Sequence, residues 1–74
     1  MLSRIKGDEF VKRVQRLGKA RDVPVVFDKH HGKGSHGTLY YVSRKTSVKD
    51  RGKELGSGLL RAMLDQLGLK KSAL

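Results

Sequence analysis

Apolar residues recur at helical spacing near both ends of the chain. The N-terminal stripe consists of Phe10, Val11, Val14 and Leu17, and the C-terminal stripe consists of Leu59, Leu60, Met63, Leu64 and Leu67. Because positions i, i+3, i+4 and i+7 share one face of an α-helix, each stripe predicts an amphipathic helix. The first helix is expected over residues 7–22, with Gly18 as an alternative end. The second is expected to have Ser57 as its N-cap residue and to stop at Gly68, which leaves residues 70–74 as a frayed tail.

Between the two helices, apolar and polar residues alternate over three short segments, and each alternation predicts a half-buried strand. These segments are 24–28, 37–43 and 46–49. Val25 and Phe27 share one face of the first strand, and Leu39 and Tyr41 share one face of the second. The links between the strands are short, so the strands should form an antiparallel meander, followed by a polar loop over 50–55. The order helix, three strands, helix predicts a two-layer α+β domain, α-β-β-β-α, with a three-stranded antiparallel sheet.

The length and the charge of the chain limit the functions that it can have. Residues 1–74 suffice for one small domain but leave no room for a second domain or a deep cofactor cleft. The net charge is +10, and residues 29–53 hold seven Lys or Arg against one acidic residue, a net charge of +6. A basic excess concentrated in one segment favours a nucleic-acid phosphate backbone as the partner. Two alternatives stay open: lysines that only keep a small domain soluble, and a basic surface that serves an acidic protein partner.

Composition also bears on the compartment. The apolar runs are far shorter than the roughly 20 residues that span a bilayer, so no membrane partner is expected. The chain has no cysteine, which excludes disulfide bonds and thiolate metal sites. Residues 1–6 lack the apolar stretch of a signal peptide. Together these features predict a cytoplasmic protein.

The segment 29–37, between the first two predicted strands, carries the candidate chemistry. It holds all three histidines of the chain, together with glycines, lysines and a serine. Glycines let a ligand approach the backbone closely, so the turn predicts a phosphate site lined by Lys33, Ser35 and the turn amides. His36 lies where the turn re-enters a strand, so the sheet is expected to hold its ring while the ring faces the turn.

His36 is the candidate catalytic residue. RNA carries its own nucleophile, the 2′-hydroxyl, and an imidazole can take its proton while cations stabilise the charge that develops on the phosphate. The ordinary pKa of histidine, about 6.5, suits proton transfer near neutrality. The neighbouring Lys29 and Lys33 favour the neutral ring, which is the form that acts as a base. The alternative is a histidine that binds phosphate or supports the structure without doing chemistry.

The sequence predicts no metal and no cofactor. The three histidines have no fourth ligand at a suitable spacing, and lysines crowd them. The glycines of the turn lack the full spacing of a nucleotide P-loop, and they lead into a strand rather than a helix. Nucleotide hydrolysis is therefore not expected either.

Two stretches of the chain resemble the HicA family of small toxins from toxin–antitoxin pairs. They are Gly34-Ser35-His36 ahead of a predicted strand, and the run KELGSGLLRAMLDQLGL at residues 53–69. The resemblance implies a double-stranded-RNA-binding-like fold, cleavage of mRNA without a metal, and a HicB-type antitoxin that masks the site. It implies that His36, in the Gly-Ser-His triplet, is the catalytic histidine. The chain departs from many members at Lys19, where they have an aromatic residue, and at 49–51, where they have a Pro-His pair.

The sequence and the resemblance together predict a metal-independent endoribonuclease toxin, an mRNA interferase, that is monomeric when free and is neutralised by a HicB-type antitoxin. His36 is expected to act as general base or acid. The residues expected to bind RNA phosphates are Lys29, Lys33, Gly34, Ser35, Arg44 and Lys49. Lys12, Arg13 and Arg16 are interpreted as the polar face of a packing helix, and contact of Arg13 or Arg16 with RNA is the alternative. The alternative function is a non-catalytic RNA-binding module on the same fold.

Overall fold

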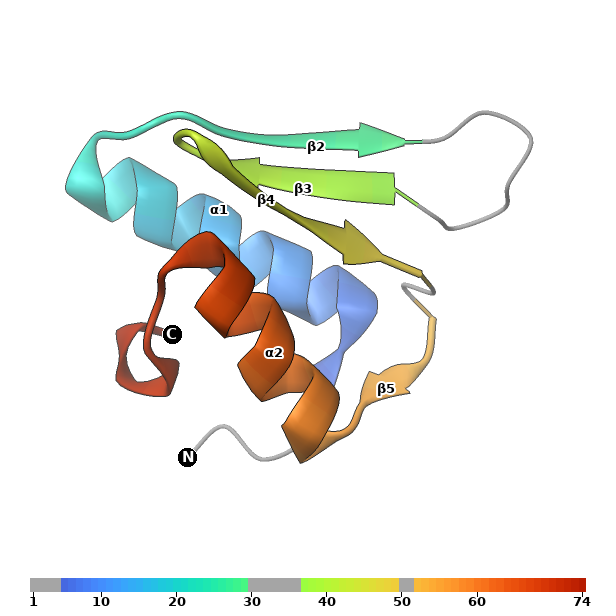
Figure 1. The fold of residues 1–74 in the computed structure, drawn as a ribbon. Coiled ribbons are helices and arrows are strands. Elements are labelled where there is room, and N and C mark those ends of the chain that lie inside the picture. Colours follow the sequence, from blue (N-terminus) through green and yellow to red (C-terminus); the bar gives the residue numbers. More distant parts are fainter. Residues whose placement is uncertain (1–4, 30–36, 50–51) are drawn as a thin grey trace.

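The structure of the chain is a computed structural model that describes residues 5–29, 37–49 and 52–74. In chain order its elements are β1 Ile5–Lys6, α1 Gly7–Arg21, β2 Val25–Lys29, β3 Gly37–Tyr41, β4 Arg44–Val48, β5 Glu54–Leu55, α2 Ser57–Leu67 and a short 3₁₀ helix Lys71–Ala73. Strands β2, β3 and β4 form an antiparallel sheet in that order, and α1 and α2 lie on one side of it (Figure 1). The chain is therefore a small α+β domain with a three-stranded antiparallel sheet and two helices, as the sequence predicted.

Helix α1 ends at Arg21, the later of its two predicted ends. Asp22 adopts a left-handed conformation with a φ of 56°, and its N–H donates a hydrogen bond to the carbonyl of Lys19 at 3.2 Å. Gly18 has a different role, because a Cβ at this position would run into the Cγ2 methyl of Val25. The glycine lets β2 lie directly against α1, and this brings the edge of the sheet close to the helix.

Helix α2 is capped by Gly56 and not by Ser57, so the predicted N-cap residue was wrong by one position. The carbonyl of Gly56 already accepts the first helical hydrogen bond, from the N–H of Leu60 at 2.9 Å. Gly68 ends the helix in a left-handed conformation with a φ of 72°, as predicted. Leu59 was expected to join the buried stripe, but it is 53% exposed. It precedes Leu60 by one residue, a rotation of about 100° around the helix, and so falls at the edge of the buried face.

The register of the sheet confirms the alternation predicted for β2 and β3. Val25 pairs with Tyr41, and Phe27 pairs with Leu39. Because Leu39 and Tyr41 are buried, this is the face of the sheet that the helices cover (Figure 1). The core continues from this face into both helices. Its largest fully buried side chains are Phe10, Val14, Leu39, Val48, Leu60, Leu64 and Leu67.

Strand β4 begins earlier than the segment 46–49 predicted from the sequence. The chain reverses through Val42 and Ser43, so pairing with β3 resumes at once, with Arg44 opposite Tyr41. Val42 has a φ of 57°, a left-handed conformation that is unusual for a β-branched residue. A turn this tight leaves no room for the connecting segment that the sequence predicted after β3.

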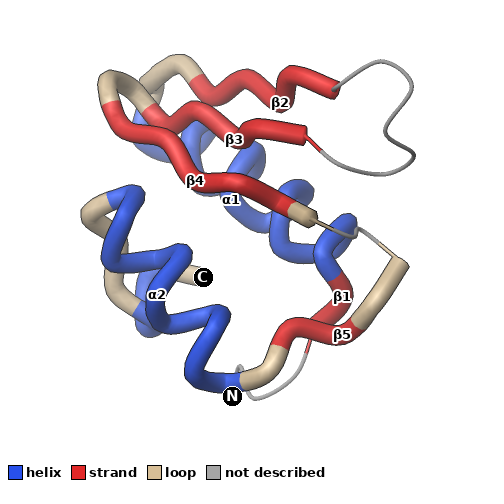
Figure 2. Tube along the Cα trace, turned by 45° about the vertical axis from the view of Figure 1, so that its right-hand side comes forward, coloured by secondary structure: helices blue, strands red, loops and turns tan. Residues whose placement is uncertain are grey.

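The predicted loop over residues 50–55 is wrong at its C-terminal end. Strand β5 pairs there with β1 in a two-stranded antiparallel ribbon, with Ile5 opposite Leu55 (Figure 2). Both residues are buried. The N–H of Gly7 adds a hydrogen bond to the carbonyl of Lys53 at 3.1 Å. The ribbon therefore ties the start of α1 to the segment that leads into α2.

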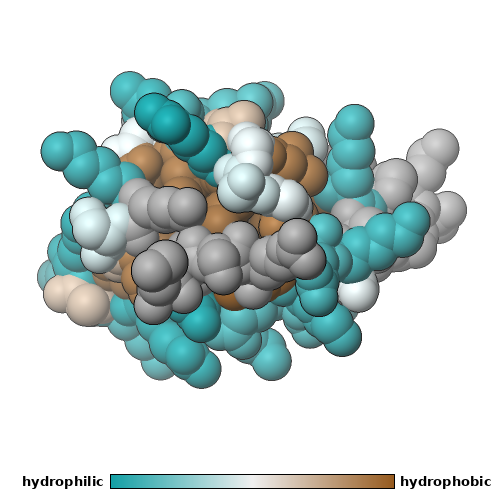
Figure 3. Space-filling model, turned by 90° about the horizontal axis from the view of Figure 1, so that it is seen from below, coloured by the Kyte–Doolittle hydropathy of each residue, from teal (hydrophilic) through white to brown (hydrophobic). Residues whose placement is uncertain are grey.

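The predicted frayed tail over residues 70–74 is also wrong. The chain turns back after α2, where the N–H of Leu69 donates to the carbonyl of Leu64 at 2.9 Å, and Leu69 is buried. The 3₁₀ helix follows, and Leu74 packs against the core. Figure 3 shows the molecule from below, with hydrophobic residues near the centre of the view and hydrophilic residues around them. A domain this small needs its terminal apolar residues to cover its core.

Candidate nucleic-acid interface

The three strands of the sheet are level with one another at one end. Lys29, the last residue of β2, pairs with Gly37, the first of β3, and Gly37 pairs in turn with Val48, the last of β4. The predicted catalytic turn is the segment between Lys29 and Gly37. Four predicted site residues in it lie outside the described part of the chain, namely Lys33, Gly34, Ser35 and His36.

Two predicted phosphate-binding residues lie at this end of the sheet. Lys29 follows Val25 and Phe27 on the side of β2 that faces the helices, and it is exposed. Lys49 follows directly after Val48 at the end of β4 and is also exposed. Because β2 and β4 flank β3, Lys29 lies at the end of one edge strand and Lys49 directly after the end of the other, and the backbones of these two strands are about 10 Å apart across the sheet. This end of the sheet therefore carries positive charge on both of its edges.

Arg44 lies at the opposite end of the sheet. It pairs with Tyr41, so the length of β3, about 13 Å between its terminal residues, separates it from the turn end. Its Nε lies 3.0 Å from the position that a Cβ on Gly68 would occupy, which places the guanidinium against the end of α2. The structure therefore brings Lys29 and Lys49 to one end of the sheet and does not bring Arg44 to it.

Gly37 is buried because β2 packs directly over it. A Cβ on Gly37 would run into Cζ of the Phe27 ring and would lie 2.8 Å from the carbonyl oxygen of Asp28. No side chain other than hydrogen fits there without a shift of the strand. The residue that follows His36 in the sequence is therefore held firmly in the sheet.

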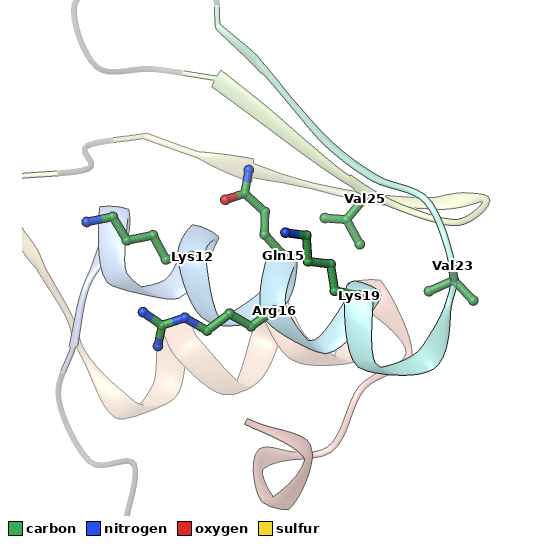
Figure 4. Close-up of a pocket in the computed structure, with 6 residues that line it drawn as sticks. All are labelled: Lys12, Gln15, Arg16, Lys19, Val23 and Val25. Atoms are coloured by element: carbon green, nitrogen blue, oxygen red, sulfur yellow. The ribbon is translucent and has the colours of Figure 1, made fainter.

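A groove with a volume of about 440 Å³ lies between α1 and the edge strand β2 (Figure 4). Its lining consists of Lys12, Gln15, Arg16, Lys19, Val23 and Val25. The three cations follow one another at i, i+4 and i+7, so they lie along one side of the helix. Val23, from the segment that leads into β2, and Val25, the first residue of β2, supply an apolar wall (Figure 4). The groove thus has one basic side and one apolar side.

The cations of the groove have no counter-charge within the described ranges. The ion pair of α1 joins Arg13 Nε to Glu9 Oε2 at 2.9 Å, outside the groove. Lys12, Arg16 and Lys19 are exposed and have no ion-pair partner among the described residues. The sequence predicted a packing role for this helix, with RNA contact by Arg13 or Arg16 as the alternative, and it did not single out Lys12 or Lys19 for that contact. The available signal was the helical spacing of its basic residues, which follows the same period as the apolar stripe.

Metal ligands do not gather in the described ranges. No group of three or more His, Cys, Asp or Glu side chains comes together there, and all three histidines of the chain lie outside those ranges. Among the described residues, neither helix combines the length and the apolar character that crossing a bilayer requires.

The chain matches no protein-family model, and no curated protein and no solved structure matches it significantly. Its function must therefore follow from its own residues. Those residues form two basic features on one domain: the end of the sheet that Lys29 and Lys49 flank, and the groove between α1 and β2.

Proposed function

We propose that this chain is a metal-independent endoribonuclease, an mRNA interferase of the HicA type, on a double-stranded-RNA-binding-like fold. The observation that carries the proposal is the pairing of Lys29 with Gly37. The Gly-Ser-His triplet immediately precedes Gly37 in the sequence, and Lys49 follows directly after the edge strand β4. The proposal expects an RNA phosphate to be attracted to this end of the sheet, where Lys29 and Lys49 lie on its two edges and where the sequence brings His36 next to Gly37.

In the proposed reaction, His36 takes the proton of a ribose 2′-hydroxyl. The 2′-oxygen then forms a bond to the adjacent phosphorus, and the bond from phosphorus to the 5′-oxygen of the next nucleotide breaks. The leaving 5′-oxygen takes a proton from water, and His36 later releases its own proton to the solvent, so the products are a 2′,3′-cyclic phosphate and a 5′-hydroxyl. Lys33, Ser35 and the amide of Gly34 would stabilise the charge that develops on the phosphate, and Lys29 and Lys49 would hold the backbone.

A toxin of this kind needs a partner that keeps it inactive, and the proposal assigns that role to a HicB-type antitoxin. The free toxin would be monomeric and would act on mRNA in the cytoplasm. An antitoxin that covers the sheet end would block the site and neutralise its charge, which suits an acidic contact surface on the antitoxin.

The test is cleavage of a defined RNA by the purified chain in excess EDTA. We expect cleavage to persist, and the products to carry the cyclic phosphate and the 5′-hydroxyl when their ends are identified by mass spectrometry. His36→Ala should lower the rate by about 10²–10⁴-fold, the usual contribution of a general base. Binding of RNA should survive this substitution.

The matched control is His30→Ala, which removes another imidazole from the same segment. It should leave the cleavage rate within a few-fold of the parent chain. Loss of cleavage on chelation, or equal losses in the two histidine variants, would contradict the proposed mechanism.

The second candidate function is a non-catalytic RNA-binding module. The groove on α1 favours it, since a surface with three cations that have no ion-pair partner among the residues the structure describes can bind RNA without any chemistry. Binding without any turnover, and a cellular effect that does not depend on His36, would select this function. If the chain bound an acidic protein tightly and had no affinity for RNA at low salt, both the nuclease and the RNA-binding module would be excluded. The remaining function would be interaction with a protein partner.

A further inference from the structure

We propose that the groove between α1 and β2 is a separate binding site for the backbone of an RNA single strand. The proposal takes its ligand, RNA, from the proposed function, but it requires no chemistry at His36. Phosphates of the strand would lie along Lys12, Arg16 and Lys19, and the sugar and base edges would lie against Val23 and Val25.

The spacing of the cations fits an extended polyanion. Lys12 and Arg16 are separated by about 6 Å along the axis of α1, and Arg16 and Lys19 by about 4.5 Å. Their charges therefore form a row along the helix and not a single cluster. All three are exposed and unpaired among the described residues, so no ion pair has to break before a phosphate binds.

The two unlike walls favour a single strand over a duplex. A duplex presents charged backbones on both of its sides and keeps its bases stacked inside, so it offers nothing to the valines. A single strand can turn its phosphates toward the helix and its exposed bases toward the apolar wall, as single-stranded RNA does in other sites. Gln15, between the cations, adds a side chain that can both donate and accept hydrogen bonds.

The groove is also oriented toward the sheet end. Strand β2 runs from the groove, at Val25, to Lys29, whose side chain is on the helix-facing side of the strand. Lys12 lies in the N-terminal half of α1, and the start of α1 and the end of β2 lie on the same side of the molecule (Figure 1). An RNA single strand held in the groove can therefore continue toward Lys29 without crossing the core of the domain.

The experiment measures binding of a single-stranded 2′-O-methyl oligonucleotide by fluorescence anisotropy over a range of salt concentrations. This probe lacks the free 2′-hydroxyl and cannot be cleaved by the proposed chemistry. The test variant is Lys12→Ala/Arg16→Ala/Lys19→Ala. We expect it to lose tenfold or more in affinity at low salt. The slope of log affinity against log salt should fall by about 2, or about 0.7 for each phosphate that a side chain no longer neutralises.

The matched control is Lys45→Ala/Arg61→Ala/Lys70→Ala, which removes the same charge from exposed positions outside the groove. It should lose only a few-fold in affinity. Equal losses in the two triple variants would overturn the proposal, since the chain would then bind RNA through net charge alone. A duplex probe with the same dependence on the groove would overturn the choice of a single strand.

A second measurement, photo-crosslinking, uses no variant and therefore does not depend on whether a variant folds. Photo-crosslinking of the unaltered chain to a single strand with 4-thiouridine should yield adducts within residues 12–25, and adducts confined to other segments would count against the groove. The groove would instead bind an acidic protein segment if oligoglutamate bound there and if the triple variant had the same RNA affinity as the parent chain. A chain that binds RNA in the groove but never cleaves it would end the nuclease proposal and leave the groove standing.

Discussion

Lys29 and Gly37 are the last pair of the ladder between β2 and β3, and they differ sharply in environment. Gly37 is buried under the ring of Phe27, whereas Lys29 is exposed. The residue that follows the proposed catalytic turn, Gly37, is therefore held by packing. The residue that precedes the turn, Lys29, is a cation that is open to a ligand. Changes at the two residues should have different consequences.

Gly37→Ala should destabilise the domain and lower cleavage together. Its methyl group would press against the ring of Phe27 and the carbonyl of Asp28. Overpacking of this kind costs about 1–3 kcal/mol, and urea denaturation measures it. Gly58→Ala is the control, because nothing lies within 4 Å of a Cβ at that position in α2. It should stabilise the domain by about 0.5–1 kcal/mol, and an equal loss in both variants would contradict the packing argument.

Lys29→Ala and Lys49→Ala should each weaken RNA binding more than Arg44→Ala does. Lys29 ends β2 and Lys49 follows directly after β4, both at the turn end of the sheet, whereas Arg44 is at the far end, against Gly68. Anisotropy titrations at several salt concentrations should show the salt slope fall by about 0.7 for each lysine and stay unchanged for the arginine. If Arg44→Ala proved as damaging as the lysine variants, RNA would have to cover both ends of the sheet.

The hydrogen bond from the Thr46 hydroxyl to Oε1 of Gln66 should show an asymmetry between its partners. Thr46 is only 3% exposed, so Gln66→Ala would leave a buried hydroxyl without its acceptor, at a cost of about 1–3 kcal/mol. Adding Thr46→Val to that variant removes the orphaned hydroxyl and should restore part of the lost stability. Thermal denaturation of the single and double variants measures this, and a double variant less stable than Gln66→Ala alone would refute it.

Val42→Gly should raise the stability of the domain. Val42 has a φ of 57° in the turn between β3 and β4, and a left-handed conformation costs a residue with a Cβ about 1–2 kcal/mol. Its side chain is 53% exposed, so little packing is lost with it. The greater freedom of glycine in the unfolded chain offsets part of the gain, which leaves an expected increase of about 0.5–1 kcal/mol. Val42→Ala keeps a Cβ at the same φ, and it should give much less of this gain in the same denaturation experiment.

Short-range patterns accounted for most of the secondary structure. The buried residues Phe10, Val14, Leu60 and Leu64 recur at helical spacing, and the alternation around Leu39 is visible in the sequence. Helix periods and strand alternation are local, because they reflect which residues of one element share a face. The order of the elements and the antiparallel sheet followed from these patterns and from the short links.

Contacts between distant segments could not be predicted in this way. The pairing of Ile5 with Leu55, the return of Leu69 and Leu74 to the core, and the exposure of Leu59 all depend on what each segment meets after the chain has collapsed. A two-residue strand carries no periodicity of its own, and a short polar segment resembles a loop until a partner satisfies its backbone.

The sequence by itself determined the element types, the basic character and the histidine-bearing segment from which a nuclease was inferred, because these depend on residue identity and local spacing. The tertiary structure set the exact register in which Lys29 and Lys49 share one end of the sheet while Arg44 takes the other. It also revealed the groove, since a row of cations on a helix becomes a site only when Gly18 lets β2 approach and supply a second wall. Proximity across elements is set by the burial of a common core, which no single stretch of sequence encodes.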